Sequence, residues 1–157
     1  MVTETIVESD DITTRQLLDR SELIELINRY GRTIDRRDWD VLDDVFVEDA
    51  EADYTRVIAN TRSDASTILA DGQLHGRAAI VAWLQAARSN NESLLHFMSN
   101  HVIDELGDDH ARMTNYVHER QGAYGTYEIE AVRTPAGWRI ARLTLDLVPR
   151  PSKMTQT

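Results

Sequence analysis

The spacing of apolar residues changes once along this chain, from a helical repeat to a strand repeat, near residue 90. Up to about Arg88 the apolar side chains recur every three to four residues, which is typical of amphipathic helices. Beyond Asn91 the period is two, and turn signals at hairpin distances separate four segments: 96–104, 111–119, 124–133 and 138–147. Helices followed by consecutive strands predict an α+β domain, in which an antiparallel sheet curls over helices packed on one face.

The length of 157 residues predicts one domain with a sizeable core. We place this domain at residues 13–149, after a flexible N-terminal arm at 1–12 and before a C-terminal tail at 150–157. Residues 55–73 are long and polar for a loop inside a compact domain. Such a loop is often a lid, so we expect a mobile segment that substrate or a partner subunit orders.

Three helices are expected before the strands. The first runs from Thr13 or Thr14 to Ile34, and the third follows Gly76 and ends near Arg88. The second begins at Asp38, a suitable N-cap, because Trp39, Leu42 and Phe46 follow at helical spacing.

The acidic composition excludes several classes of partner. A formal charge of −10 opposes binding to nucleic acids or to anionic membranes. The chain has no cysteine, and therefore neither a disulfide nor a thiolate nucleophile. No secretory signal and no apolar run of about 20 residues is present, so a cytoplasmic protein is expected.

Two polar residues stand where chemistry could occur. Asp35 falls on the flank of the first helix, roughly 80° past Ile27, where a carboxylate could reach a cavity; the alternative is that it only ends the helix. His96 opens a strand amid apolar residues, where a packed core histidine is the alternative to a catalyst. His101 follows five residues later, which on a regular strand places it on the opposite face. No two histidines have helical i, i+4 spacing, so no metal site is expected.

Six short motifs occur in an order that resembles one protein superfamily. They are Tyr30-x4-Asp35, Asp38-Trp39, Phe46-x2-Asp49-Ala50, Gly76-Arg77-x2-Ile80, His96-x3-Asn100 and Gly137-Trp138-Arg139-Ile140. Together they resemble the SnoaL-like branch of the nuclear-transport-factor-2-like (NTF2-like) superfamily over nearly the whole chain. The resemblance implies a cone, made of a curved antiparallel sheet wrapped around the N-terminal helices, with a central pocket. It also implies a homodimer or a higher homo-oligomer, because family members often pair through their sheets.

Within that branch the chain is similar to the scytalone and bile-acid dehydratases, whose sites combine tyrosines, an aspartate and a histidine. This similarity implies a catalytic role for four residues: His96, Asp35, Tyr30 and Tyr54. The candidates for contacts with the substrate are Glu119, Asn115, Trp83 and Met98. The chain departs from the bile-acid enzyme in its longer 55–73 segment and in Leu147, where that enzyme has an arginine. Both departures concern substrate binding, so the substrate stays open.

The chemistry of this set follows from its side chains. If Asp35 accepts a hydrogen bond from one ring nitrogen of His96, it fixes the tautomer and leaves the other nitrogen as a base. A tyrosine with a pKa of about 10 stays protonated and can donate to a carbonyl oxygen or to a departing hydroxyl. The combination suits removal of a proton next to a carbonyl, and it requires no cofactor.

The sequence therefore predicts a cofactor-independent enzyme that acts on a small hydrophobic substrate, polycyclic or polyketide-like, with dehydration as the favoured reaction. An isomerase or a polyketide cyclase with the same dyad is the first alternative. A non-catalytic module that binds a small ligand is the second.

Overall fold

The computed structural model describes residues 4–60, 72–89, 94–119 and 124–148. Its helical elements are α1 (Glu4–Arg36), η1 (Trp39–Asp44), α2 (Thr55–Asn60) and α3 (Arg77–Ala87). Its strands are β1 (Phe46–Asp53), β2 (Gln73–His75), β3 (His96–Leu106), β4 (His110–Glu119), β5 (Tyr124–Thr134) and β6 (Gly137–Val148). Among the helices in these ranges, none is long and apolar enough to cross a bilayer.

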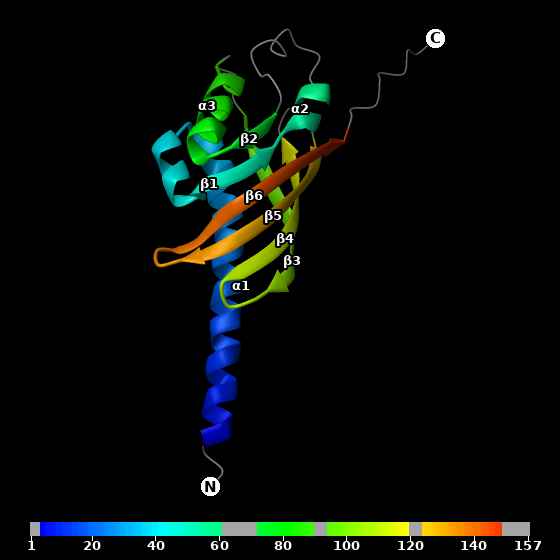
Figure 1. Cartoon of the computed structure of the whole chain (residues 1–157). Helices are drawn as coiled ribbons and strands as arrows, with labels where there is room; N and C mark the ends of the chain where they lie inside the picture. Colours follow the sequence, from blue (N-terminus) through cyan, green and yellow to red (C-terminus); the bar gives the residue numbers. More distant parts are fainter. Residues whose placement is uncertain (1–3, 61–71, 90–93, 120–123, 149–157) are drawn as a thin grey trace, which may run out of the picture.

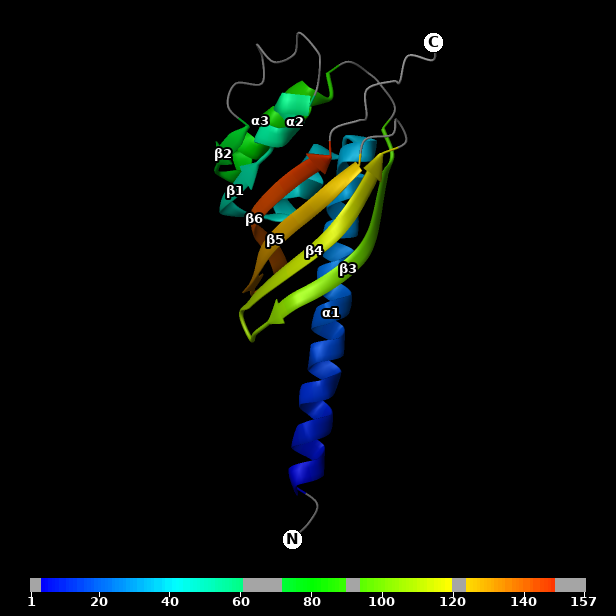
Figure 2. The same cartoon turned by 90° about the vertical axis from the view of Figure 1, so that its right-hand side faces the viewer.

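The strands form one curved sheet of order β2-β1-β6-β5-β4-β3, which wraps around the upper half of α1 (Figures 1 and 2). The predicted α+β fold, a curved sheet over N-terminal helices, is confirmed. The sheet is mixed rather than wholly antiparallel, however, because β1 pairs with β6 in parallel. The chain between these two strands contains α2, α3 and four further strands, so no hairpin forces them to run in opposite directions.

The core forms between the inner face of the sheet and one face of α1. Leu23, Leu26, Ile27, Tyr30 and Ile34 follow each other at helical spacing and are all buried. Burial of each such side chain stabilises the fold by about 1.5–3 kcal/mol. These residues set the orientation of α1, and with it the direction in which Asp35 points.

Helix α1 extends beyond the sheet toward the N-terminus (Figure 1). It begins at Glu4, within the arm expected at residues 1–12, so the helix is longer than the apolar spacing predicts. Leu17 and Leu18, directly before the buried Asp19, are 64% and 60% exposed. The flexibility of the arm stays a prediction.

The second predicted helix is a short 3-10 segment, η1, and the helical spacing misplaces Phe46, which begins β1. Asp38 occupies the N-cap position of η1 without a side-chain cap hydrogen bond. Of the segment 55–73, α2 and the residues from Gly72 on are described. Residues 61–71 and the tail at 150–157 lie outside the described ranges, so the lid and the tail stay predictions.

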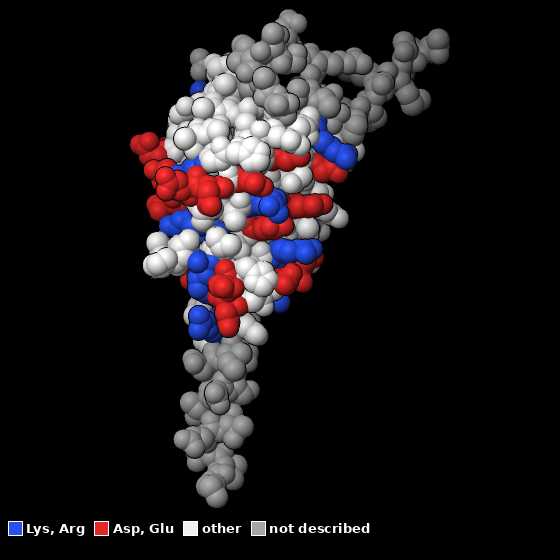
Figure 3. Space-filling view, in the orientation of Figure 1, with Lys and Arg blue, Asp and Glu red and all other residues white. Residues whose placement is uncertain are grey.

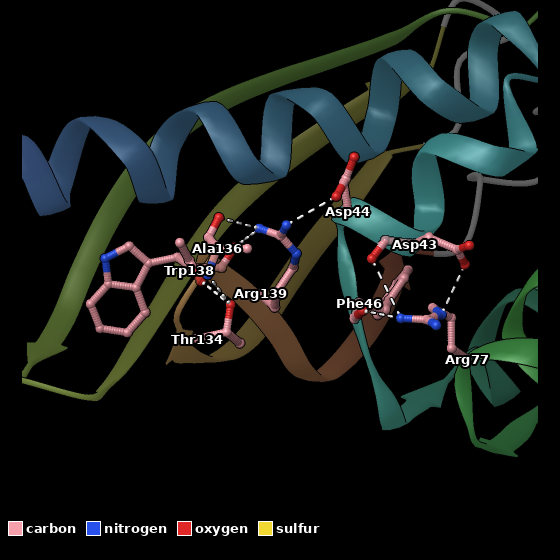
Figure 4. A network of polar contacts seen from close by, with 9 residues as sticks. Asp43, Asp44, Phe46, Arg77, Thr134, Ala136, Trp138 and Arg139 are labelled. Atoms are coloured by element: carbon pink, nitrogen blue, oxygen red, sulfur yellow. Dashed lines mark hydrogen bonds and ion pairs between the residues drawn. The ribbon is translucent and has the colours of Figure 1, made fainter.

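Two arginines hold η1 against the sheet and α3 (Figure 4). Arg77, at the start of α3, pairs with Asp43 at 3.0 Å and donates to the Phe46 carbonyl oxygen at 3.1 Å. Arg139 of β6 donates to the Asp44 carboxylate at 3.0 Å. These contacts fix the turn between the end of α1 and the first strand.

The outward faces of β1, β5 and β6 carry acidic and basic side chains side by side (Figure 3). Arg142 of β6 lies between Glu51 of β1 and Glu130 of β5, at 3.1 Å from each. Exposed pairs of this kind contribute about 0–1 kcal/mol each. They keep this part of the surface hydrated more than they stabilise the fold.

A polar cluster fastens the middle of α1 to the β5–β6 hairpin. The buried carboxylate of Asp19 forms an ion pair with Arg133 at 2.6 Å and accepts from the Trp138 indole N–H at 3.2 Å. The Arg133 guanidinium also lies 4.4 Å from the centre of the Trp138 ring. Burial alone would raise the pKa of Asp19, but the hydrogen bonds from Arg133 and Trp138 lower it below its usual value.

Strand β3 contains a bulge between Ser99 and Val102, where it has one residue more than β4. Asn100 takes a φ of 52° there, a conformation that asparagine tolerates better than most residues. The extra residue shifts the alternation of side chains. Val102 is therefore 52% exposed, whereas His96 and His101 are both half-buried. The expectation that these two histidines lie on opposite faces is wrong, because it assumed a regular strand.

Candidate active site

Asp35 and His96 meet where the C-terminal end of α1 passes the first residue of β3. The Asp35 Oδ1 atom lies 2.6 Å from His96 Nδ1, and Asp35 Oδ2 accepts from the His96 backbone N–H at 3.0 Å. Their side chains are 12% and 4% exposed. Because the carboxylate can only accept, we assign the ring proton of the neutral imidazole to Nδ1, which leaves a lone pair on Nε2. The predicted contact is present; its catalytic role stays a prediction.

Gly31, one turn before Asp35, lets α1 approach β3 closely. A Cβ atom at this position would lie 2.6 Å from Met98 Cε and 3.3 Å from His96 Cβ. Glycine inside a helix costs about 1 kcal/mol relative to alanine. The contact between Asp35 and His96 depends on this close approach of helix and strand.

Glu119 approaches the other nitrogen of the ring. It is the register partner of His96 on β4, and its Oε1 atom lies 3.8 Å from His96 Nε2. This distance is too long for a hydrogen bond. The Glu119 carboxylate therefore lies on the Nε2 side of the ring, opposite the Asp35 contact at Nδ1.

Three buried tyrosines lie under the same part of the sheet. The Tyr30 and Tyr54 hydroxyls are 2.7 Å apart, and the Tyr127 ring packs edge-on against Tyr30 at 5.6 Å. Burial raises the pKa of all three well above 10, so each phenol stays protonated at neutral pH. The charges of Glu119 and Asp35 further raise the pKa of Tyr127, which links the tyrosines to the dyad electrostatically.

Sequence reasoning missed Tyr127. The available signal was its position on β5, two residues before the buried Ile129, which marks it as facing inward. A single inward-facing tyrosine on a strand is interpreted as a core residue unless the residues around it in space are known.

Three of the predicted substrate contacts are buried or half-buried beside this group. Trp83 of α3 stacks on Tyr54 at 4.5 Å, and its buried Nε1 has no partner among the described residues. Asn115 of β4 is fully buried and donates through Nδ2 to the Tyr116 carbonyl oxygen at 3.0 Å and to the Met98 sulfur at 3.5 Å. Its Oδ1 atom has no partner in the same ranges.

Cavities of about 370, 420 and 250 Å³ open elsewhere on the molecule. The first two border α1, next to the β5–β6 turn and to η1, and the third borders β1 and β2. None of the three is lined by Asp35, His96 or the buried tyrosines. Over the described part of the chain, no group of three or more histidine, aspartate or glutamate side chains is placed to hold a metal ion.

Comparison with known families decides where the chain belongs. The family model of the SnoaL-like domain matches residues 15–144, which is most of the chain. The chain belongs to the SnoaL-like family. An uncharacterised protein of Mycobacterium tuberculosis is 27% identical to this SnoaL-like protein over 147 residues, which cover 87% of this chain and 90% of the relative.

Solved structures share the fold. A protein of Novosphingobium aromaticivorans, provisionally named an aromatic ring hydroxylase, is 25% identical with a TM-score of 0.68 and covers 85% of this chain and 92% of its own. Another, provisionally named a scytalone dehydratase, is 21% identical with a TM-score of 0.69, at 87% and 88% coverage. An NTF2-like protein with a cystatin-like fold from the same organism is 24% identical with a TM-score of 0.69, at 94% and 92% coverage. The last two likenesses concern the fold alone.

Proposed function

We propose that this SnoaL-like protein is a cofactor-independent enzyme that removes a proton next to a carbonyl group of a small hydrophobic, polycyclic or polyketide-like substrate. The observation that carries the proposal is the double contact between the Asp35 carboxylate and His96. It directs the lone pair of Nε2 away from the helix and toward the side chain of Glu119. A core histidine that only packs does not need a carboxylate to select its tautomer.

Dehydration is the outcome that we favour. His96 Nε2 takes the proton from the carbon next to the carbonyl, and the C–H electron pair passes into an enolate. A buried phenol, Tyr30 or Tyr54, donates to the enolate oxygen. The enolate re-forms the carbonyl as a carbon–carbon double bond forms and the bond to the β-hydroxyl breaks. The hydroxyl leaves as water with the proton that His96 took up, so the ring returns to its starting state.

Isomerisation and ring closure share the first step, and the dyad alone does not choose among the three. In an isomerisation the enolate is reprotonated at a different carbon. In a cyclisation its carbon attacks a second carbonyl of the same molecule. The identity of the product is therefore a separate measurement from the loss of the proton.

We expect side chains beside the dyad to move when a substrate binds. Met98 is the residue that we expect to move first. It is half-buried next to Gly31, its sulfur contacts Asn115, and its unbranched side chain has several rotamers of similar energy. Its displacement would open space beside His96 without breaking the core of α1.

A homodimer or higher homo-oligomer is part of the proposal. The outward face and the ends of β3 to β6 expose large apolar side chains at Leu95, Phe97, Val102, Tyr116, Tyr124 and Val148. An exposed apolar group of this kind favours association through the sheet. Sedimentation equilibrium of the wild type and of a Phe97→Glu variant tests this, and a monomeric wild type would refute it.

The test of the mechanism is hydrogen–deuterium exchange at carbon in D₂O, with rigid cyclic ketones of two to four fused rings followed by NMR. His96→Ala should slow the enzyme-dependent exchange by about 10²–10⁴, while the dissociation constant changes by less than about tenfold. Tyr54→Phe should be milder, because it removes one donor and keeps the ring. The same histidine-to-alanine change at the exposed His118 is the matched control.

Two results would overturn the proposal. Exchange at the wild-type rate in His96→Ala would mean that the histidine is structural. Tight binding of a ketone that the wild type neither exchanges nor converts would favour a ligand-binding module without catalysis.

A further inference from the structure

The bulge in β3 brings a second histidine to the inner face of the sheet. Ser99 pairs with Tyr116 and Val102 pairs with Thr114, so the two residues between them on β3 lie opposite the single residue Asn115 on β4. His101 is the inward-facing member of those two, since it is half-buried with its Nδ1 atom fully buried. His101 and Asn115 are therefore neighbours across the two strands, on the inner face of the sheet.

The amide of Asn115 can be oriented from its contacts. Its Nδ2 atom faces the Tyr116 carbonyl oxygen at 3.0 Å, and only a donor is stable in front of that oxygen. The Oδ1 atom is therefore the one that points elsewhere, and it has no partner among the described residues. Asn115 is completely buried, so bulk water does not reach this acceptor.

His101 presents a complementary group. Its Nδ1 atom is buried and unpartnered over the same ranges, and burial lowers the pKa of the ring, which is therefore neutral at pH 7. A neutral imidazole carries one N–H donor and one acceptor. A buried polar atom without a partner costs free energy, and native structures keep few of them without a reason.

We propose that His101 and Asn115 form a subsite that binds a hydroxyl group of the ligand inside the cone. A hydroxyl donates to the Oδ1 atom of Asn115 and accepts from the ring N–H of His101, so it satisfies both residues at once. A carbonyl or an ether oxygen can only accept and would leave Asn115 unpaired. The inference rests on the proposed function in one respect: it takes the cone to be the place where the substrate binds.

The position of the subsite also sets the length of the ligand. His101 lies five positions after His96, a span of at most about 16 Å at the rise of an extended strand, and the bulge shortens it. A ligand that reaches both residues needs its hydroxyl and its carbonyl at opposite ends of a rigid frame. We therefore expect an alcohol or phenol on a polycycle of several fused rings.

The experiment compares two probes, estrone and 3-deoxyestrone, which share a four-ring frame and a ketone and differ only in the phenol at the far end. Their dissociation constants are measured by calorimetry for the wild type and for Asn115→Leu and His101→Leu. The wild type should bind estrone about tenfold more tightly, the effect of one well-made hydrogen bond to a buried partner. Each variant should reduce this ratio to less than about twofold, mainly through weaker binding of estrone.

Substitutions at the exposed Asn100 test the bulge without touching the buried pair. Asn100→Gly keeps the positive φ and should keep the preference for estrone, whereas Asn100→Val disfavours that conformation and should lose it. His118→Leu, an outward histidine on β4, is the control for the introduced leucine. Circular dichroism reports whether each variant is folded.

Each outcome decides the proposal. Equal affinities for the two probes in the wild type, binding of neither probe, or an unchanged preference in folded Asn115→Leu would overturn the subsite. Exchange of the estrone α-protons is followed in the same samples. A preference for estrone without exchange of its α-protons would support the subsite and contradict the proposed catalysis. Exchange without a preference for estrone would support the catalysis and contradict the subsite.

Discussion

Replacement of Asp35 by asparagine is the sharpest perturbation of the dyad, because it removes one acceptor and changes almost no volume. In the wild type both carboxylate oxygens accept from His96, at 2.6 Å from the ring Nδ1 and at 3.0 Å from the backbone N–H. An amide offers one oxygen and one NH₂ group. If its oxygen stays on the backbone N–H, its NH₂ group faces Nδ1, which must then accept. The ring proton moves to Nε2, and the base is lost.

The magnitude follows from these two contacts. A positioned general base contributes about 10²–10⁴ in rate, or about 3–5 kcal/mol of barrier, and Asp35→Asn should lose most of it. A hydrogen bond to a charged group contributes about 1.5–3 kcal/mol and a neutral one about 0.5–1.5 kcal/mol. The net loss of stability should therefore be about 1–2 kcal/mol, or about 2–8 °C in Tm for a chain of this size.

Three measurements check this prediction: the exchange rate of a ketone in D₂O, the thermal unfolding midpoint, and the ¹⁵N chemical shifts of the His96 ring, which report the tautomer. Asp38→Asn is the matched control, because Asp38 is exposed and makes no side-chain cap hydrogen bond. It should leave all three unchanged. A variant at Asp35 that carries its proton on Nε2 and still exchanges within about threefold of the wild type would refute the reasoning.

Two further predictions concern the scaffold. Asp19→Ala leaves the Arg133 guanidinium without its buried carboxylate and should cost about 3 kcal/mol, or about 6–12 °C in Tm; a shift below 2 °C would contradict the role of the cluster. The pKa of Asp19 is lowered in the folded state, so its contribution to the free energy of unfolding is present above about pH 3.8 and is lost as the pH falls through the folded pKa. The wild type should therefore lose more stability on acidification than Asp19→Ala. Gly31→Ala should lower Tm despite the better helix propensity of alanine, because the new methyl group overlaps Met98 Cε, and Met98→Ala should recover most of the loss in the double variant.

The four hairpin strands could be predicted from sequence almost to the residue. Period-two alternation specifies which side chains face inward. Gly107 lies in the turn after β3, and Gly137 begins β6 directly after the turn that ends β5. The contact between Asp35 and His96 was also anticipated, but only through the resemblance to a family. Taken separately, Asp35 on the flank of a helix could simply end that helix, and His96 at the start of an apolar strand could simply be a packed core residue.

The missed features depend on partners that are distant in sequence. The bulge at Asn100 is a mismatch of one residue between β3 and β4, which the alternation of either strand alone does not reveal. The parallel pairing of β1 with β6 joins residues about 90 apart in the chain, beyond any local pattern. Tyr127 becomes a candidate site residue only because it packs against Tyr30 and lies near the acidic groups of the site, which the sequence alone does not show.

The place of β6 within the sheet has a consequence for how the protein must be made. The last of the described strands in chain order, β6 (Gly137–Val148), is not at an edge but lies between β1 and β5, and it alone joins the β2-β1 pair to the β5-β4-β3 hairpins. While this segment is still inside the ribosome, the β2-β1 pair and the β5-β4-β3 strands can form separately but cannot join into one sheet. The apolar inner face of each part then stays exposed. Emergence of β6 from the ribosome is therefore the step that lets the core be completed, and a chain truncated before β6 should be aggregation-prone rather than a smaller folded protein.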